Sequence, residues 1–170
     1  MNKKRIKMSS FMIKGRIVLN GVKGLFFFLI IQFLISCGSS SSTTISNGVS
    51  VSRYQYVVFG NESDGDAELD DIILIVQNEI ARRLHVVSPI QALEIVNEGQ
   101  YVLSPKISAK SEKWDGGHAY ITISFYDYNT NMIAFVVKSS GIGLSLDDDK
   151  DLALKAIRKE LDKVLPVMIK

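Results

Sequence analysis

The residues best suited to acid–base chemistry are the histidines, because imidazole titrates near neutral pH without help from its surroundings. His118 follows Glu112 and Asp115 around a predicted hairpin turn, which would place carboxylates beside an imidazole. His85 lies far from it in the sequence. A solvated turn histidine explains the same pattern, and we expect this simpler role. A hydrolytic site near the Trp114–His118 hairpin is kept as the alternative.

Sequence motifs for other chemistry are incomplete. The chain has no G-x-S-x-G segment, no H-E-x-x-H helix and no P-loop. Gly141 and Gly143 begin a dinucleotide-binding pattern, but Leu146 stands where its third glycine belongs. We therefore predict no catalytic residues, no cofactor and no enzymatic activity.

An acidic cluster at Asp64–Asp71 has the alternating spacing of calcium ligands. A calcium-binding EF-hand loop needs glycine at its sixth position and a carboxylate at its twelfth. Counted from Asp64, these positions hold Leu69 and Ile75. We predict no metal site, and interpret the cluster as carboxylates favoured by the positive end of a helix dipole.

The single cysteine, Cys37, closes an apolar run at 25–35 and directly follows Ser36. Seven basic residues and no acidic ones precede Cys37. A membrane-spanning helix needs roughly 20 apolar residues to cross a ~30 Å hydrocarbon core, so this shorter run is typical of a cleaved signal peptide. An uncleaved N-terminal anchor is the alternative.

The segment Leu34-Ile35-Ser36-Cys37 resembles the lipobox of bacterial lipoproteins. The resemblance implies signal cleavage between Ser36 and Cys37, a diacylglyceryl thioether on Cys37 and a further acyl chain, such as palmitate, on the new amino group. It implies a membrane partner through that anchor. Because Gly38 rather than aspartate follows the cysteine, it also implies the outer membrane. The lack of an acidic run after the cysteine favours a periplasm-facing protein, with surface exposure as the alternative.

The predicted organisation is a signal peptide at 1–36, a lipidated Cys37 with a flexible Ser/Thr-rich linker at 37–52, and a periplasmic domain at 53–170. Residues 1–36 hold seven of the 20 Lys and Arg residues and none of the 18 acidic residues. The mature chain therefore carries 13 basic and 18 acidic side chains, a net charge of −5. This acidic balance argues against a nucleic-acid partner.

Hydrophobic periodicity predicts the order β-α-β-α-β-β-β-α. Strands are expected at 53–59, 85–87, 100–114, 118–127 and 132–139, and helices at 67–84, 89–97 and 148–165. The fold class is α+β, with a single mixed, mostly antiparallel sheet of about five strands and three helices mainly on one face. Pro105 suggests an edge or a bulge, and Gly141 and Gly143 are expected to loosen the chain before the last helix.

The strand expected at 118–127 alternates apolar and polar residues. Ile121, Ile123 and Phe125 share one face, and Tyr120 and Tyr126 share the other. With Trp114 in the preceding turn, Tyr120 and Tyr126 form a candidate aromatic binding face. Packing under a helix or loop is the alternative explanation for these aromatic residues.

Residues 83–109, RLHVVSPIQALEIVNEGQYVLSPKISA, resemble the curli-secretion lipoprotein and the N-terminal domain of the Tol-associated propeller protein. The YDYNT turn at 126–130 resembles that of small envelope lipoproteins. These resemblances imply a binding or assembly role in the cell envelope with a protein partner, and they transfer no site residues. The sequence therefore favours a non-enzymatic outer-membrane lipoprotein.

Replacing Cys37 should test this anchor directly. We expect Cys37→Ser to abolish metabolic lipid labelling and to leave unprocessed precursor, because no other thiol in the chain can accept the lipid. The measurement is labelled-palmitate incorporation together with precursor size on a gel. Normal maturation of this variant would contradict the lipoprotein hypothesis.

Overall fold

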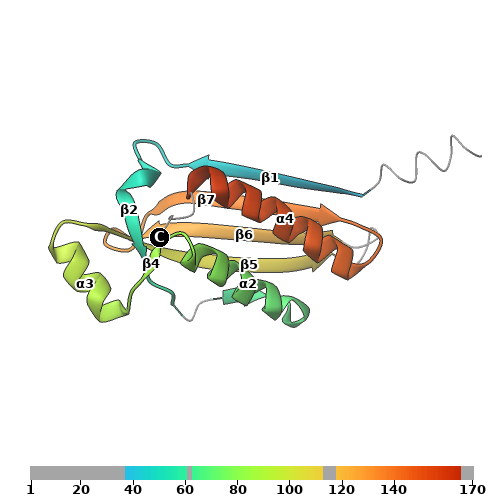
Figure 1. Ribbon diagram of the computed structural model, residues 1–170, viewed down its shortest axis with the longest axis horizontal. Helices are drawn as coiled ribbons and strands as arrows, with labels where there is room; N and C mark the ends of the chain where they lie inside the picture. Colours follow the sequence, from blue (N-terminus) through green and yellow to red (C-terminus); the bar gives the residue numbers. More distant parts are fainter. Residues whose placement is uncertain (1–36, 61–62, 113–117, 166–170) are drawn as a thin grey trace, which may run out of the picture. The chain divides into compact units, whose positions relative to one another are not determined.

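The computed structural model describes residues 37–60, 63–112 and 118–165, which form a mixed sheet with helices packed on it (Figure 1). The strands are β1 Gly38–Ile45, β2 Tyr54–Val57, β3 Ser63–Gly65, β4 His85–Val86, β5 Tyr101–Glu112, β6 His118–Asp127 and β7 Ile133–Ile142. The α-helices are α2 Asp70–Ala81, α3 Pro89–Asn97 and α4 Leu146–Val164, with 3-10 turns at Val51–Arg53 and Ala67–Leu69. None of the described helices is long and apolar enough to cross a membrane.

Six strands follow one another across the sheet in the order β1-β7-β6-β5-β2-β4, and the short β3 pairs with β5 beside β2. The pairs β1–β7, β7–β6 and β6–β5 are antiparallel. Strands β2 and β3 each pair in parallel with β5, and β4 pairs in parallel with β2. The prediction of an α+β fold with one mixed sheet is confirmed. The sheet has more strands than the five expected, because β1 and β3 lie in segments that we expected to be linker and loop.

Local sequence signals place the helices well. Ser88 caps α3 in a capping box: its hydroxyl oxygen accepts from the backbone N–H of Gln91, and the side-chain oxygen of Gln91 accepts from the backbone N–H of Ser88. Pro89 occupies the first helical position, where no N–H is needed. Helix α4 begins two residues before the predicted boundary, because Ser145 rather than a later residue is its N-cap.

The main core lies between one face of the sheet and helices α2 and α4 (Figure 1). Ile121, Ile123 and Phe125 point into it as their alternation predicts, and the rings of Phe125 and Phe135 stack at 4.2 Å between centroids. A smaller cluster joins α3 to Val58 and Val102. These two residues alternate with core residues Val57 and Leu103, so α3 packs against the opposite side of the sheet end.

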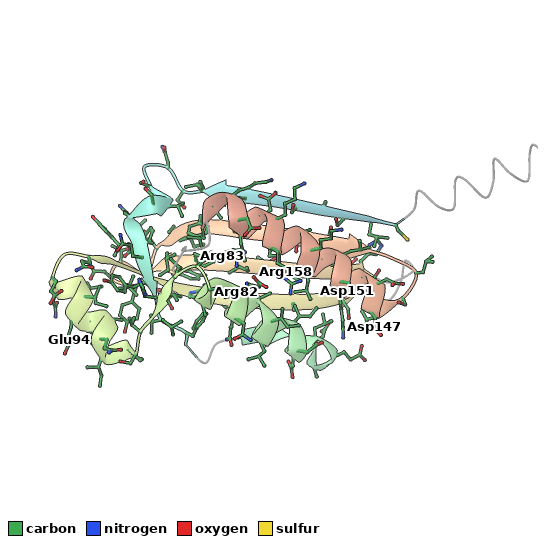
Figure 2. All side chains as sticks on the ribbon, viewed as in Figure 1. Arg82, Arg83, Glu94, Asp147, Asp151 and Arg158 are labelled. Carbon is green, nitrogen blue, oxygen red and sulfur yellow. The ribbon has the colours of Figure 1, made fainter. Side chains whose placement is uncertain are left out.

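Helices α2 and α4 are also joined by a network of ion pairs. Two of its members, Arg83 and Arg158, are labelled in Figure 2. Arg83, in the turn that follows α2, is almost fully buried and contacts both Glu79 on α2 and Asp162 on α4. The Arg158 Nε donates to Glu79 at 2.9 Å. Burial raises the pKa of Glu79, but the hydrogen bonds from both arginines outweigh it and lower the pKa. The pairing thus satisfies buried charges that would be costly alone.

The expectation of a flexible linker after Cys37 is wrong for its first half. Strand β1 pairs antiparallel with β7 over its whole length, from Gly38 opposite Ile142 to Ile45 opposite Phe135. Ser41 and Thr43 donate from this strand to the buried carboxylate of Glu160 on α4. The Ser/Thr-rich composition predicted a coil. Residues 38–45 form a strand instead because they pair with the edge of β7 and donate hydrogen bonds to the buried Glu160, and these tertiary contacts outweigh the weak coil preference of the segment.

Glu160 accepts three side-chain hydrogen bonds in this contact. The bond from Lys163 is the largest influence on its pKa and lowers it, burial acts in the opposite direction, and the bonds from Ser41 and Thr43 add to the lowering. A carboxylate with a depressed pKa stabilises the fold above its ordinary pKa and loses that contribution on acidification. The attachment of β1 to α4 is therefore strongest at neutral pH.

Two other backbone expectations need correction or refinement. Gly141 does not loosen the chain but lies within β7. Glycine is needed here because α4 packs closely on the strand: a Cβ atom would lie 2.1 Å from the Asp149 carbonyl oxygen. Pro105 stands in the middle of β5, where pairing with β2 ends at Leu103 and pairing with β3 begins at Ile107. The strand is locally an edge at this gap, so the missing N–H is tolerated.

Substitutions at Ile123 and Thr122 test the two faces of the sheet. Ile123 is fully buried, whereas Thr122 on the other face is only partly buried. We expect Ile123→Asp to cost several kcal/mol of the ~5–15 kcal/mol that stabilises a domain, and Thr122→Asp to cost about 0.5 kcal/mol. Urea midpoints of the two variants measure this difference. Equal losses would mean that both faces of the sheet are covered.

Candidate ligand-binding pocket

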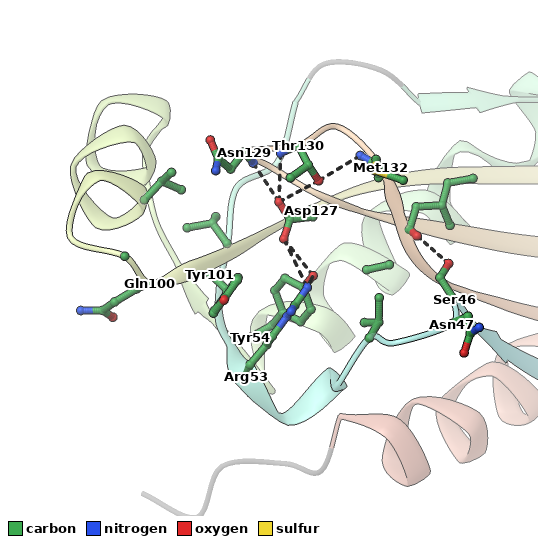
Figure 3. Close-up of a pocket in the computed structure, with 16 residues that line it drawn as sticks. Ser46, Asn47, Arg53, Tyr54, Gln100, Tyr101, Asp127, Asn129, Thr130 and Met132 are labelled. Carbon is green, nitrogen blue, oxygen red and sulfur yellow. Dashed lines mark hydrogen bonds and ion pairs between the residues drawn. The ribbon is translucent and has the colours of Figure 1, made fainter.

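The main candidate site is a cavity of about 440 Å³ at the end of the sheet opposite Cys37 (Figure 3). Three segments far apart in sequence form it: 46–54 between β1 and the start of β2, 96–102 from the end of α3 into β5, and 127–134 from the end of β6 into β7. The lining residues are Ser46, Asn47, Val49, Arg53, Tyr54, Val96, Gly99, Gln100, Tyr101, Val102, Asp127, Asn129, Thr130, Met132, Ile133 and Ala134.

Asp127 organises the floor of this cavity. Its Oδ1 accepts from the backbone N–H of Asn129 at 3.2 Å, and from the backbone N–H and hydroxyl of Thr130 at 3.0 and 3.1 Å. These bonds close the β6–β7 turn, in which Asn131 takes a left-handed φ of 55°. Burial raises the pKa of Asp127, but the bonds from Thr130, Tyr54 and Asn129 outweigh it and lower the pKa.

The second oxygen of Asp127 binds a tyrosine and an arginine. Its Oδ2 accepts from the Tyr54 hydroxyl at 2.9 Å, and the Arg53 Nη2 lies 3.8 Å away and donates to the Tyr54 oxygen at 2.8 Å. Burial, followed by the interactions with Asp127, raises the pKa of Tyr54 despite the opposing effect of Arg53. The tyrosine therefore stays a neutral donor at physiological pH.

Arg53 keeps unused capacity to bind a ligand. Its guanidinium lies over the rings of Tyr101 and Tyr54, 4.2 and 4.9 Å from their centroids, which fixes its position. Its hydrogen bond and its ion pair within the described residues both use Nη2, and Nε has no hydrogen-bond partner there. This Nε is buried, but the side chain as a whole is 33% exposed, so a positive charge borders the cavity.

The rim combines polar and apolar groups. Asn47, Gln100 and Asn129 bring amide groups, whereas Tyr101 and Met132 are 42% and 70% exposed. Such a mixture suits a ligand that offers an acidic or acceptor group to a guanidinium and an apolar surface to the rim. Because Asp127 is ionised and all its bonds are made within the turn and to Tyr54 and Arg53, it is poorly suited to act as a general acid.

A second hollow of about 570 Å³ lies on the other side of the same turn. Its lining residues are Gly60, Ser104, Pro105, Lys106, Tyr126, Tyr128 and Asn131. One of the predicted aromatic residues, Tyr126, is therefore part of a concave surface. Tyr120 lies six residues away on the same face, roughly 20 Å along the strand, with its hydroxyl 3.5 Å from Glu112. Trp114 falls outside the described residues, so the three-residue binding face stays a prediction.

The histidine proposed for acid–base chemistry lies away from both hollows. His118 pairs with Glu112 across β5 and β6, stacks on Tyr120 at 6.1 Å between centroids, and has a buried Nδ1 without a hydrogen-bond partner. Asp115 lies outside the described residues. In the described part of the chain, no group of three or more His, Cys, Asp or Glu residues is placed to hold a metal ion.

Sequence inspection did not single out the residues that build the cavity. Asp127 could have been recognised locally as a turn residue, because aspartate often accepts hydrogen bonds from backbone N–H groups in turns such as Tyr126–Thr130. Nothing local indicated that Arg53 and Tyr101 would meet over it, because β2 and β5 become neighbours only through the parallel pairing of the sheet. Cys37 is free and exposed, at the far end of β1 from this cavity.

No protein-family model and no curated protein sequence matches the chain. Among solved structures, it is similar to the PelC dodecamer from Paraburkholderia phytofirmans, with 17% identity and a TM-score of 0.46 over 76% of this chain and 99% of that one. A methionine-substituted PelC dodecamer from the same organism gives 16% identity and a TM-score of 0.45 over 74% and 98%. Similarities of this size concern the general arrangement of strands and helices only.

Asp127→Asn tests whether this carboxylate holds the pocket together. The amide keeps the shape but places an N–H₂ group or a weaker acceptor beside Tyr54 and Arg53, so we expect a loss of about 1–3 kcal/mol at pH 7. Asp151→Asn, an exposed position on α4, should change stability by less than about 0.5 kcal/mol.

The effect of Asp127→Asn should depend on pH. The depressed pKa of Asp127 means that its contribution is present above the ordinary aspartate value of about 3.9 and is lost as the pH falls below it. The difference between wild type and variant in urea midpoint should therefore shrink from pH 7 toward pH 3. A difference that is constant over this range would exclude the ionised carboxylate as its cause.

Proposed function

We propose that this protein is a non-enzymatic lipoprotein of the bacterial outer membrane, a binding component of the cell envelope that faces the periplasm. The single observation that carries the proposal is the geometry of β1. This strand starts next to Cys37, the residue with the lipobox pattern, and ends next to Ser46, which lines the cavity. One rigid element thus connects the predicted anchor to the candidate binding site.

The strand supports this role because it separates Cys37 at one end of the sheet from the cavity at the other end. Eight residues of extended chain span roughly 25 Å at ~3.3 Å per residue. Pairing with β7 and the Glu160 contact prevent β1 from acting as a loose tether. A ligand in the cavity would therefore be held at a fixed distance from the membrane, as suits a component that receives something from the periplasm.

The chemistry of the cavity favours binding over catalysis. Arg53 supplies a fixed positive charge, Tyr101 and Met132 supply exposed apolar surface, and Asp127 is held as a saturated, ionised carboxylate. This set recognises an acidic or acceptor group joined to an apolar portion. We infer that the ligand is an envelope component with both features, such as an extended segment of a protein partner that carries a carboxylate.

The alternative of an envelope hydrolase would need catalytic groups that converge on a cavity. His118 and Glu112 are paired across the sheet near the Cys37 end, and neither lines the two hollows described above. We therefore favour the binding role, and we place the protein in the outer membrane because Gly38 follows the cysteine.

Photo-crosslinking in the native envelope tests the proposal. A crosslinking amino acid at Met132, 70% exposed on the cavity rim, is compared with one at Leu74, 60% exposed on α2. We expect a discrete crosslinked product at position 132 that is weak at position 74. Adding Tyr101→Ala, which removes the exposed ring from the rim, should reduce that product several-fold while lipid labelling stays normal.

Two results would contradict the proposal. Identical products at positions 132 and 74 would show that the cavity has no special role. A product at position 132 that is unaffected by Tyr101→Ala would place the contact outside the cavity. The folded state of the Tyr101→Ala variant is checked by its urea midpoint.

A further inference from the structure

The end of the sheet that carries Cys37 exposes apolar side chains that the fold does not need to expose. Gly38 pairs with Ile142, which is 38% exposed, and Leu144 follows in the turn to α4. At 83%, Leu144 is the most exposed large apolar side chain among the described residues. Ile142 and Leu144 therefore lie directly beside Cys37, the predicted lipid attachment point.

The turn holds Leu144 in this exposed position. The backbone N–H of Gly143 donates to Asp149 Oδ1, and Asp149 itself is fully buried. A Cβ atom at Gly143 would lie 2.5 Å from the Asp148 Cβ, so the turn packs closely against the start of α4. Ser145 then caps this helix through the backbone N–H of Asp148 at 3.2 Å. Leu144 is thus fixed between two anchored residues and projects outward.

We propose that this turn rests on the bilayer, with Leu144 inserted among the acyl chains beside the lipid on Cys37 and Ile142 at the interface. The inference rests on the proposed lipid anchor and deepens it. We choose the bilayer as the partner of this apolar turn because β1 begins at Gly38, directly after the predicted lipid attachment point at Cys37. Acyl chains on Cys37 can enter a membrane only if the membrane comes within about one residue of Ile142 and its turn.

The charges near the turn set how deeply it enters. Asp147 and Asp148 are exposed directly after the turn, and their carboxylates must stay among the headgroups. Insertion is therefore limited to the tip of the turn, within the ~5–10 Å depth that interfacial segments reach. This shallow contact adds an orienting point to the lipid: two attachments on one end of the sheet keep the cavity at the other end facing away from the membrane.

Spin labelling of the lipidated protein tests the contact. Because lipid occupies the Cys37 thiol, Leu144→Cys introduces the only thiol of the mature chain, and Met132→Cys does the same at the cavity end. Both positions are largely exposed, so neither substitution should affect folding. Each purified lipoprotein is reconstituted in phosphatidylcholine vesicles, labelled with a thiol-specific nitroxide and measured for collision with oxygen and with a water-soluble nickel complex.

We expect the ratio of oxygen to nickel accessibility to be several-fold higher at position 144 than at position 132. Equal ratios with complete lipidation would overturn the bilayer contact and leave the anchor intact. Labelling of the unsubstituted chain would reveal a free Cys37 thiol, which would overturn the lipid anchor and this inference with it. The two failures are therefore distinguishable in one experiment.

Discussion

The arrangement of this protein depends on the docking of β1 onto the edge of β7 and onto α4. Eight paired residues and the buried carboxylate of Glu160 hold the strand. Without this contact, residues 38–45 would be a loose polar tether of the kind their composition suggests. With it, the residue predicted to carry lipid becomes part of a rigid sheet, and the distance between the two ends of the sheet is fixed.

The two ends of the sheet that β1 spans differ in chemistry. At one end, the exposed Leu144 lies on a turn held by Asp149 and capped by Ser145, next to Cys37. At the other, the β6–β7 turn uses one oxygen of Asp127 to bind its own amides and the other to bind Tyr54. That second oxygen also positions Arg53 at the cavity. The predicted anchor and the proposed ligand site share no residue.

The buried charges of the molecule are mainly devoted to structure. Glu79, Arg83 and Arg158 join α2 to α4, and Glu160 joins α4 to β1. The donors around Glu79 and Glu160 hold the pKa of each of these two carboxylates below its ordinary value, so their contacts are strongest at neutral pH. Arg53 differs from the almost fully buried Arg83 because its side chain is 33% exposed at the border of a cavity. This difference is why we assign binding to Arg53 and stability to the others.

The sequence by itself determined the elements whose signals are local. The alternation from His118 to Asp127, the capping box at Ser88 and the apolar stripes of α2 and α4 depend only on neighbouring residues, and the predicted α+β fold is confirmed. Only the tertiary structure decided that 38–45 is a strand and that Arg53, Tyr101 and Asp127 share a pocket. These features depend on which strand edges are free and on which segments the sheet brings together, and Ser/Thr-rich chain has no strong preference of its own.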